Sequence, residues 1–273
     1  MLSSLTSGVT GLDSFQEQMD VIGNNIANLN TTGFKTGVVD FADAFSDTLQ
    51  GAGTSTPAMQ VGTGVNIAAI NSNWSQGAIT STGVPSNLAI SGNGFFEVVD
   101  PVTSAKYFTQ DGTFSVNPSG YLVTSGGDYV QGYTGGSTTL GNVQVTSNPA
   151  NSALSMSSFT IDSQGHINVT QSDGSTYLSG QVLLQNVQDP QMLTNEGNNL
   201  FSNFQAAGAN AALGAPGSNG LGTIQSGALE ASNVDLSTEM ANLITAQRAF
   251  EASSKMITTS NEVLQTVVNM KQS

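Results

Sequence analysis

LSTEMANLITAQRAFEASSKMITTSNEVLQTVV, residues 236–268, is the longest regular stretch in this chain of 273 residues. Apolar and small polar side chains recur in it at alternating steps of four and three, which places them on one side of an α-helix. The stripe consists of Leu236, Met240, Leu243, Gln247, Phe250, Ser254, Ile257, Asn261, Leu264 and Val268. Asp235 precedes it as a candidate N-cap. The stretch predicts a long helix that packs against another helix, as in a coiled coil.

A similar stripe near the other end of the chain provides a partner for this helix. Its spacing of three and four residues is that of a helix and not of a strand. It contains Leu2, Leu5, Val9, Leu12, Phe15, Met19, Ile22, Ile26 and Leu29. Gly8, Gly11 and Gly23 interrupt it, and each costs up to about 1 kcal/mol relative to alanine. We therefore expect a helix that is weak alone and depends on a partner surface.

Between the two stripes, residues 34–224 carry strand and turn signals. Residues 88–99 predict two strands around a glycine-rich turn, and Asp111-Gly112 is a hairpin signal. Further turns at 117–120, 162–165 and 172–174 separate short strand patterns, the last leading to a strand at 181–187. Residues 134–158 and 205–219 are expected to be either surface loops or poorly ordered segments. Short strands at such spacing favour a sandwich or an open barrel-like sheet.

These patterns predict an α+β fold. Long paired N- and C-terminal helices, like a coiled coil, flank an inserted and mostly antiparallel β domain. The expected segments are an N-terminal helix over 1–33, an extended connector over 34–75, a β-rich outer domain over 76–225, and a C-terminal helix over 226–273 that pairs with 1–33.

Composition excludes several classes of function. The chain has five Lys and Arg residues against 19 Asp and Glu, a net charge of −14, and 9% charged residues. Five cations cannot neutralise a run of phosphates, so we expect no nucleic-acid partner. The first residues lack the pattern of a cleaved signal peptide, and no apolar run is long enough to predict membrane insertion.

Catalysis and metal binding lack a motif. The chain has no cysteine and a single histidine, His166. The Gly92-x-Gly94 pair precedes a predicted strand, whereas a dinucleotide fingerprint needs a helix there. Asp111-Gly and Asp173-Gly lack the spacing of a calcium loop. We therefore predict a protein that is not an enzyme and has no catalytic residues, no cofactor and no metal.

Two stretches resemble known motifs. MDVIGNNIANLNTTGFK, residues 19–35, resembles the N-terminal signature of the flagellar rod and hook proteins, and residues 227–250 are similar to the C-terminal motif of that family. Residues 88–96 and 107–123 resemble its shared β core. The motif residues matched are Asn24, Asn25, Ala27, Asn28, Gly33, Phe34 and Lys35.

The resemblance implies a subunit of the flagellar axial tube. Such a protein is exported by the flagellar type III apparatus without a cleaved signal, and its terminal helices line an inner tube while its β domains form the outer wall. The implied partners are further copies of the chain, the export apparatus, and adjacent axial proteins of the rod, the hook–filament junction and the hook cap. The implied location is the basal body and the hook, outside the cell.

The resemblance also implies which residues join the subunits. The apolar positions expected in the tube are Leu5, Val9, Leu12, Phe15, Met19, Ile22, Ile26, Leu236, Met240, Leu243, Phe250, Ile257, Leu264 and Val268. The asparagines Asn24, Asn25 and Asn28 either bond to backbone or neighbouring subunits, or simply cap the helix. Arg248 either bridges subunits, to Asp20 or Glu17, or pairs with Glu251 on its own helix.

Residues 130–133 and 41–45 look more like hook proteins, and the chain lacks the large inserted domain of the longer ones. We therefore predict a short hook protein, which polymerises into a flexible joint that transmits torque. The alternative is a rigid distal-rod subunit, in which residues 46–60 would brace neighbouring copies. A third possibility is a monomeric secreted β-domain binding module with a helical stalk, for which the terminal helices would be dispensable.

Overall fold

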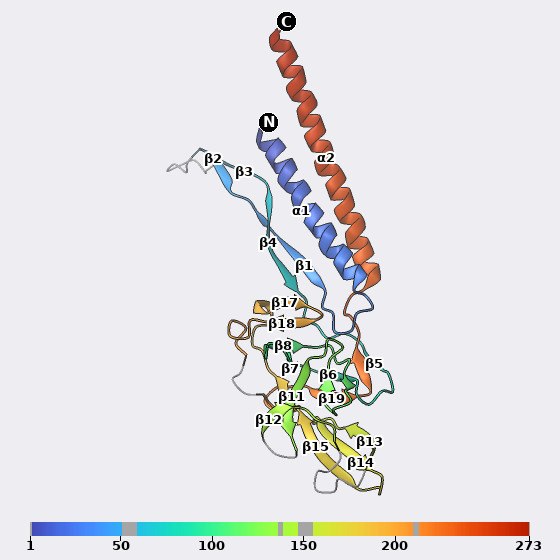
Figure 1. Cartoon of the computed structure of the whole chain (residues 1–273). Helices are drawn as coiled ribbons and strands as arrows, with labels where there is room; N and C mark the ends of the chain where they lie inside the picture. The colour runs from blue at the N-terminus through green and yellow to red at the C-terminus, as the bar shows by residue number, and fades with distance from the viewer. Residues whose placement is uncertain (1, 51–58, 136–138, 147–154, 210–212, 273) are drawn as a thin grey trace. The chain divides into compact units, whose positions relative to one another are not determined.

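A computed structural model describes residues 2–50, 59–135, 139–146, 155–209 and 213–272. In these ranges two helices lie toward the ends of the chain and antiparallel strands lie between them (Figure 1). The predicted α+β class is confirmed. The chain divides into two compact units: the first contains residues 1–29, 36–73 and 234–273, and the second contains 30–35 and 74–233. Residues 36–73, expected to be a connector, thus group with the helices.

The helices α1 (Leu2–Ala27) and α2 (Leu236–Gln272) pack side by side in opposite directions (Figure 1). The carboxylate of Asp235 accepts the N–H of Ser237 at 2.8 Å, so it caps α2 as predicted. At the end of α1 the backbone and side-chain amides of Asn28 both donate to the carbonyl of Asn24. These bonds are those of a helix end capped within the chain, and a role of the asparagines between subunits stays a prediction.

The contact face of α2 differs in part from the predicted stripe. Leu243, Phe250, Ile257 and Leu264 are half-buried, but the predicted intervening positions are exposed. The positions that take their place are Glu239, Ala246 and Ser253, which are buried, and Ser260, which is half-buried. Large residues therefore alternate with residues that lie one position earlier than the pattern suggested.

Glycines on α1 explain which residues of α2 lie at the contact. A Cβ on Gly8 would lie 2.8 Å from Cγ1 of Ile257, and one on Gly11 would lie 3.2 Å from the hydroxyl of Ser253. The two backbones thus approach too closely for larger side chains on α1 at these points. Two of the glycines that weaken the isolated helix, Gly8 and Gly11, are therefore the residues that let it pair.

A β ribbon completes the first unit. Strand β1 (Gly37–Asp43) pairs antiparallel with β4 (Val65–Ser72), and β2 (Ser46–Gln50) pairs with β3 (Met59–Gly62). The ring of Phe41 contacts that of Phe15 on α1, with centroids 6.0 Å apart. Residues 51–58, within the segment expected to distinguish rod from hook proteins, lie outside the described residues.

The second unit is built on a sheet of twelve described strands. Its main path runs β13-β14-β15-β11-β7-β8-β18-β17, with β9, β10, β12 and β16 attached to it, and every pairing is antiparallel. These strands are β7 (Phe95–Val99), β8 (Lys106–Thr109), β9 (Ser115–Val116), β10 (Leu122–Val123), β11 (Tyr129–Thr134), β12 (Leu140–Asn142), β13 (Met156–Ile161), β14 (His166–Gln171), β15 (Thr176–Val182), β16 (Leu184–Gln185), β17 (Thr194–Gly197) and β18 (Leu200–Ser202).

Two smaller pairs and one short helix complete this unit. Strand β6 (Leu88–Ser91) pairs with β19 (Thr223–Ser226), and β5 (Ile79–Ser81) pairs with β20 (Ala228–Glu230). A 3₁₀ turn, η2, covers Pro190–Met192. The main core packs apolar residues from β6, β7, β11, β14 and β15, including Leu88, Phe96, Val130, Ile167 and Val182. A second cluster joins Phe95, Phe108 and Phe201.

Several strand predictions are confirmed and one turn is wrong. The turns at 117–120 and 162–165 do join paired strands. At Asp111-Gly112, however, β8 pairs with β7 and β18 and not with β9. The carboxylate of Asp111 accepts bonds from Thr113 and Thr32, and the carbonyl of Gly112 accepts the N–H of Leu88. These bonds direct the chain away from a hairpin.

The strand predicted at 181–187 starts earlier, because β15 occupies residues 176–182. The expected loop at 134–158 contains β12 and the start of β13 among its described residues. Its residues 136–138 and 147–154 lie outside the described part of the chain, as do 210–212 in the expected loop at 205–219.

Candidate assembly site

In the first unit, Asn25 ties α1 to both the ribbon and α2. Its side chain is 2% exposed. Its carbonyl oxygen accepts the N–H of Gly37 at 2.9 Å, and its amide donates to the carbonyl of Gly37 at 2.9 Å and to the carboxylate of Glu239 at 3.3 Å. One buried amide thus satisfies the start of β1 and a buried acid on α2. The bonds between the side chain of Asn25 and the backbone of Gly37 are of the kind expected for Asn24, Asn25 and Asn28, here within one chain.

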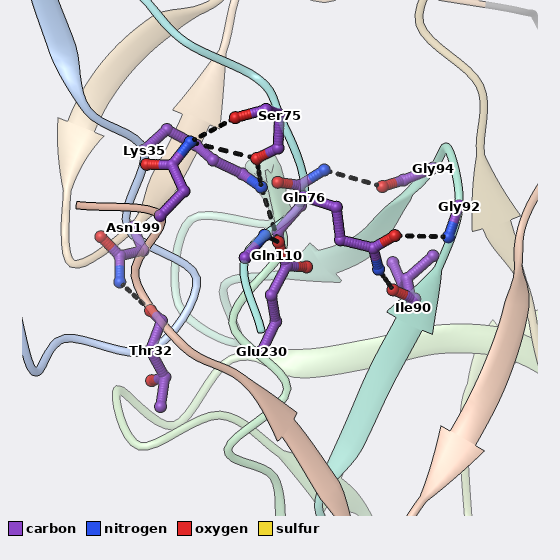
Figure 2. A network of polar contacts seen from close by, with 12 residues as sticks. Thr32, Lys35, Ser75, Gln76, Ile90, Gly92, Gly94, Gln110, Asn199 and Glu230 are labelled. Atoms are coloured by element: carbon purple, nitrogen blue, oxygen red, sulfur yellow. Dashed lines mark hydrogen bonds and ion pairs between the residues drawn. The ribbon is translucent and has the colours of Figure 1, made fainter. Parts of the chain in front are cut away.

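In the second unit, Lys35 forms a buried ion pair with Glu230. The two charged atoms lie 2.7 Å apart, and the side chains are 3% and 4% exposed. The ammonium also donates to the carbonyl of Ser75 at 3.1 Å (Figure 2). The carboxylate accepts the N–H of Gly77 at 2.8 Å. Two charges removed from water need such partners, because the desolvation cost of each is several kcal/mol.

Backbone bonds fix the same two segments together. The N–H of Gly33 donates to the carbonyl of Glu230 at 2.9 Å, and the carbonyl of Phe34 accepts the N–H of Asn233 at 3.4 Å. The carbonyl of Thr32 accepts the side-chain amide of Asn199 at 2.8 Å (Figure 2). Residues 30–35 are therefore bound to residues far along the chain, and the motif is a structural junction in this unit.

Gly33 is required at this junction for two reasons. Its φ is +68°, in the region that favours glycine. A Cβ at this position would also lie 2.9 Å from the backbone nitrogen of Asp111. Any larger residue would therefore meet both strain and a clash with backbone.

A pocket of about 430 Å³ lies beside the ion pair in the second unit. Its lining includes Trp74, Gln76, Asn93 and Gln110. The side-chain amide of Gln76 bonds to the backbone of Ile90 and Gly92, and that of Gln110 bonds to the carbonyl of Gly94 (Figure 2). The amide of Gln76 and the side-chain nitrogen of Gln110 are therefore engaged by the chain itself. The side-chain oxygen of Gln110 and the indole nitrogen of Trp74 are buried without a hydrogen-bond partner among the described residues.

The described residues contain no group of three or more histidine or acidic side chains suited to a metal ion. His166 pairs with the carboxylate of Asp162 at 3.0 Å on the surface of the turn before β14. Among the described residues, neither helix is long and apolar enough to span a membrane.

The predicted interface positions divide into two groups. Ile22 is buried between the elements of the first unit, and a half-buried group faces inward: Leu5, Leu12, Phe15, Met19, Ile26, Leu243, Phe250, Ile257 and Leu264. Val9, Leu236, Met240 and Val268 are exposed on the outside of the helix pair, at 41–54%. Contacts within the chain use the first group, and the role of both groups between subunits stays a prediction.

Other predicted residues have simpler surroundings. Ala27 and Asn24 are exposed at the end of α1. Arg248 pairs with Glu251 at 3.0 Å, with both side chains largely in solvent. The local pairing of Arg248 is thus present in the single chain.

Sequence reasoning missed two acids, Glu230 and Glu239. Both lie in the C-terminal motif, and both are buried. A lysine inside a motif with little other charge needs a carboxylate partner, and this requirement was the available signal for Glu230. For Glu239 no signal was available, because the predicted apolar stripe placed it outside the contact face of the helix. Its burial depends on which residues of α2 face α1.

The segments that form the junction and the helix pair match models of known protein families. The family described as "Flagella basal body rod protein" matches residues 5–35, and "Flagellar basal body rod FlgEFG protein C-terminal" matches 225–270. Between them, "Flagellar hook protein FlgE/F/G D1 domain" matches residues 89–169. The flagellar basal-body rod protein FlgG of Bacillus subtilis is 37% identical over 278 aligned residues, covering 100% of both chains.

The chain belongs to the flagellar basal-body rod and hook protein family. It is therefore a structural subunit of the flagellar axis and not an enzyme, as the sequence predicted. Within the flagellum it is a component of the basal-body rod.

One bacterium provides relatives of both types. The rod protein FlgG of Borreliella burgdorferi is 34% identical over 282 aligned residues and covers 100% of both chains. The hook protein FlgE of the same bacterium is 44% identical, but over 140 residues, which are 49% of this chain and 31% of the hook protein. The full-length similarity is therefore to rod proteins, and the comparisons favour the rod alternative over the predicted hook subunit.

Proposed function

We propose that this chain is a subunit of the distal flagellar rod, a rigid shaft that carries torque to the hook. The observation that carries the proposal is similarity to rod proteins from end to end, whereas the hook protein matches half of the chain. The shared half includes motifs common to both types. Residues 41–45 were interpreted as hook-like, but the full-length relatives of this chain are rod proteins. These residues therefore do not favour the hook assignment.

The rod forms by polymerisation through the terminal helices. Leu236, Met240 and Val268 on α2 and Val9 on α1 are apolar and exposed in a single copy. Burying an exposed apolar side chain contributes about 1.5–3 kcal/mol, so contacts with neighbouring copies stabilise the polymer. The partners are further copies of this chain and the adjacent axial proteins of the rod and hook.

The β ribbon of the first unit supports rigidity. It presents apolar side chains to solvent: Phe45, between β1 and β2, is 95% exposed, Met59 on β3 is 56% exposed, and Ile70 on β4 is 50% exposed. Such exposed apolar groups on a projecting ribbon are typical of an interaction surface. A ribbon that packs against the next copy would add a contact resisting bending, in addition to those of the helices.

Export without a cleaved signal, through the flagellar type III apparatus, follows from the same role. A chain without cysteine carries no disulfide that would obstruct passage in an unfolded state. Assembly would then take place at the growing end of the rod, outside the cytoplasm.

Deletion of the coding region tests the proposal. Basal bodies purified from the deletion strain are imaged by electron microscopy, beside a strain complemented with the parent chain. We expect truncated rods with no hook or filament beyond them, restored by complementation. Complete rods that lack only the hook would overturn the rod assignment and restore the hook prediction.

A further inference from the structure

Three acids form a row on the outer face of α1. Asp13, Glu17 and Asp20 follow at steps of four and three, which places them on one face of the helix. All three are exposed, and in the described part of the chain none has a cation within ion-pair distance. We call this set the acidic row. Three like charges on one face of an isolated helix repel one another, so the row is a cost unless a cation approaches.

Two cations form a matching row on α2. Arg248 and Lys255 are seven residues apart, two turns of helix, as are Asp13 and Asp20. Arg248 is 77% exposed and holds Glu251 through one nitrogen, which leaves other N–H groups of its guanidinium for a second carboxylate. Lys255 is exposed, and within the described ranges it makes no ion pair. We call Arg248 and Lys255 the basic row.

Both rows point away from the contact between α1 and α2. Arg248 follows buried Ala246 by two residues, and Lys255 follows buried Ser253 by two. Two residues rotate the side chain by about 200° around a helix axis, to the opposite face. In the acidic row, Asp13 follows buried Gly11 by two residues, and Asp20 precedes buried Ile22 by two. These acids therefore also lie on the outer face of their helix. The two rows of one copy therefore cannot meet each other.

We propose that the acidic row of one copy binds the basic row of the neighbouring copy, an inference that rests on the polymer of the proposed function. The occupant of each row is thus a second copy of this chain, selected by charge complementarity. Because the two rows lie on different helices of one molecule, the contact is head-to-tail, which does not form a closed two-fold dimer. Combined with the screw rotation between copies in the proposed rod, it continues as an open polymer.

The helices fix the register of this contact. Copies related by a screw rotation keep the direction of their helices, so α1 of one copy runs opposite to α2 of the next, as within a copy. Asp13 then lies level with Lys255, and Asp20 with Arg248. Within a copy, Gly8 lies level with Ile257 and Asn25 with Glu239. The difference is three to four residues, an axial shift on the order of 5 Å at about 1.5 Å per residue.

The contribution of the rows is specificity more than strength. An exposed ion pair contributes about 0–1 kcal/mol, and Glu251, between the two cations, already takes part of the charge of Arg248. The apolar positions of the helices hold the polymer together. Charge complementarity speeds encounter and rejects a copy that arrives out of register, because that copy would place like charges together.

A charge swap tests the proposal in the deletion strain. One variant carries Asp13→Lys and Asp20→Lys, a second carries Arg248→Glu and Lys255→Glu, and a third combines all four changes. The readout is the number of complete rods in purified basal bodies, with the amount of exported chain measured in parallel. A control with Asp173→Lys and Glu196→Lys makes the same charge change as the first variant, at exposed positions of the second unit.

We expect each single-row variant to yield about tenfold fewer complete rods than the parent, and the combined variant to recover most of them. Recovery excludes misfolding as the cause of the loss. Full rods from both single-row variants, or a combined variant as poor as either, would overturn the proposal. The rod assignment is separate, because it depends on whether the parent chain restores truncated rods.

Crosslinking tests the register independently. The natural chain has no cysteine, so a thiol-specific crosslinker reacts with the introduced cysteines and with no other thiol of the chain. With Asp20→Cys and Arg248→Cys in one chain, a short bismaleimide should link assembled copies into a ladder of oligomers. Moving the second cysteine to Ala246, on the inward face of α2, should abolish the ladder. A ladder from this control, or none from the first variant, would contradict the register.

Discussion

Removing one partner of the buried ion pair in the second unit should destabilise that unit strongly. The charged atoms of Lys35 and Glu230 are 2.7 Å apart, with side chains 3% and 4% exposed. In Lys35→Met the carboxylate stays buried with the N–H of Gly77 as its remaining bond. Breaking a buried pair in this way costs about 3–5 kcal/mol, and we expect that loss from Lys35→Met and from Glu230→Leu.

The double variant, Lys35→Met with Glu230→Leu, should lose far less than the sum of the two. It removes both buried charges and leaves the N–H of Gly77 without its acceptor, which costs about 1–3 kcal/mol. The pair of Lys106 and Glu97 serves as a graded control, because its lysine is 61% exposed although its glutamate is only 9% exposed. Lys106→Met should therefore cost less than Lys35→Met, since solvent reaches the lysine and screens the pair.

Urea unfolding measures all four variants against the parent chain. The signal is the fluorescence of Trp74, the single tryptophan, which packs against Phe95 and Phe201 in the same unit as the ion pair. Single variants that each lose under about 1 kcal/mol would refute the reasoning, because the pair would then not be desolvated. A double variant that loses the full sum would refute it as well, because the two charges would not be coupled.

Three further predictions concern single positions. Gly33→Ala should cost about 2–4 kcal/mol by urea unfolding, from strain and a backbone clash, whereas Gly174→Ala, at φ +83° with open space, should cost about 1–2 kcal/mol. Equal costs would mean that the clash is absent. Gly8→Leu should reduce the number of complete rods, because the side chain would separate the helix pair, and Gly23→Leu, which meets open space, should not; equal counts would contradict the close approach. The pKa of Asp100 lies below its ordinary value of 3.8, because a threonine hydroxyl and a backbone N–H donate to its carboxylate. Its contribution to stability is therefore complete above pH 3.8 and is lost as the pH falls through the lowered pKa. An NMR titration that gives the ordinary value would contradict this.

The fold class could be predicted because two long periodic stretches flank a region of turns. Positions such as Phe250 and Ile257 are apolar at helical spacing, so the sequence alone indicates that they face a partner. Which residues lie between them on the contact face of α2 could not be predicted. It depends on how closely α1 approaches, and this follows from Gly8 and Gly11 meeting Ser253, a property of two segments together.

The polar residues of the site show the same division. Asn25 and Lys35 stood out by their motif, but their partners Gly37 and Glu230 depend on tertiary contacts. The hairpin expected at Asp111 failed for the same reason, because long-range bonds to Thr32 compete with the local turn. Local patterns predict elements well, and they leave open which distant segments will satisfy buried polar groups.

The position of the chain in the intact flagellum tests the central claim most directly. An epitope inserted at Gly174, in the exposed turn between β14 and β15, can be labelled with gold-conjugated antibody on isolated hook–basal bodies. A tagged chain that restores motility in the deletion strain provides the specimen. The account predicts label on the rod and none on the hook. Label along the hook with a bare rod would contradict it.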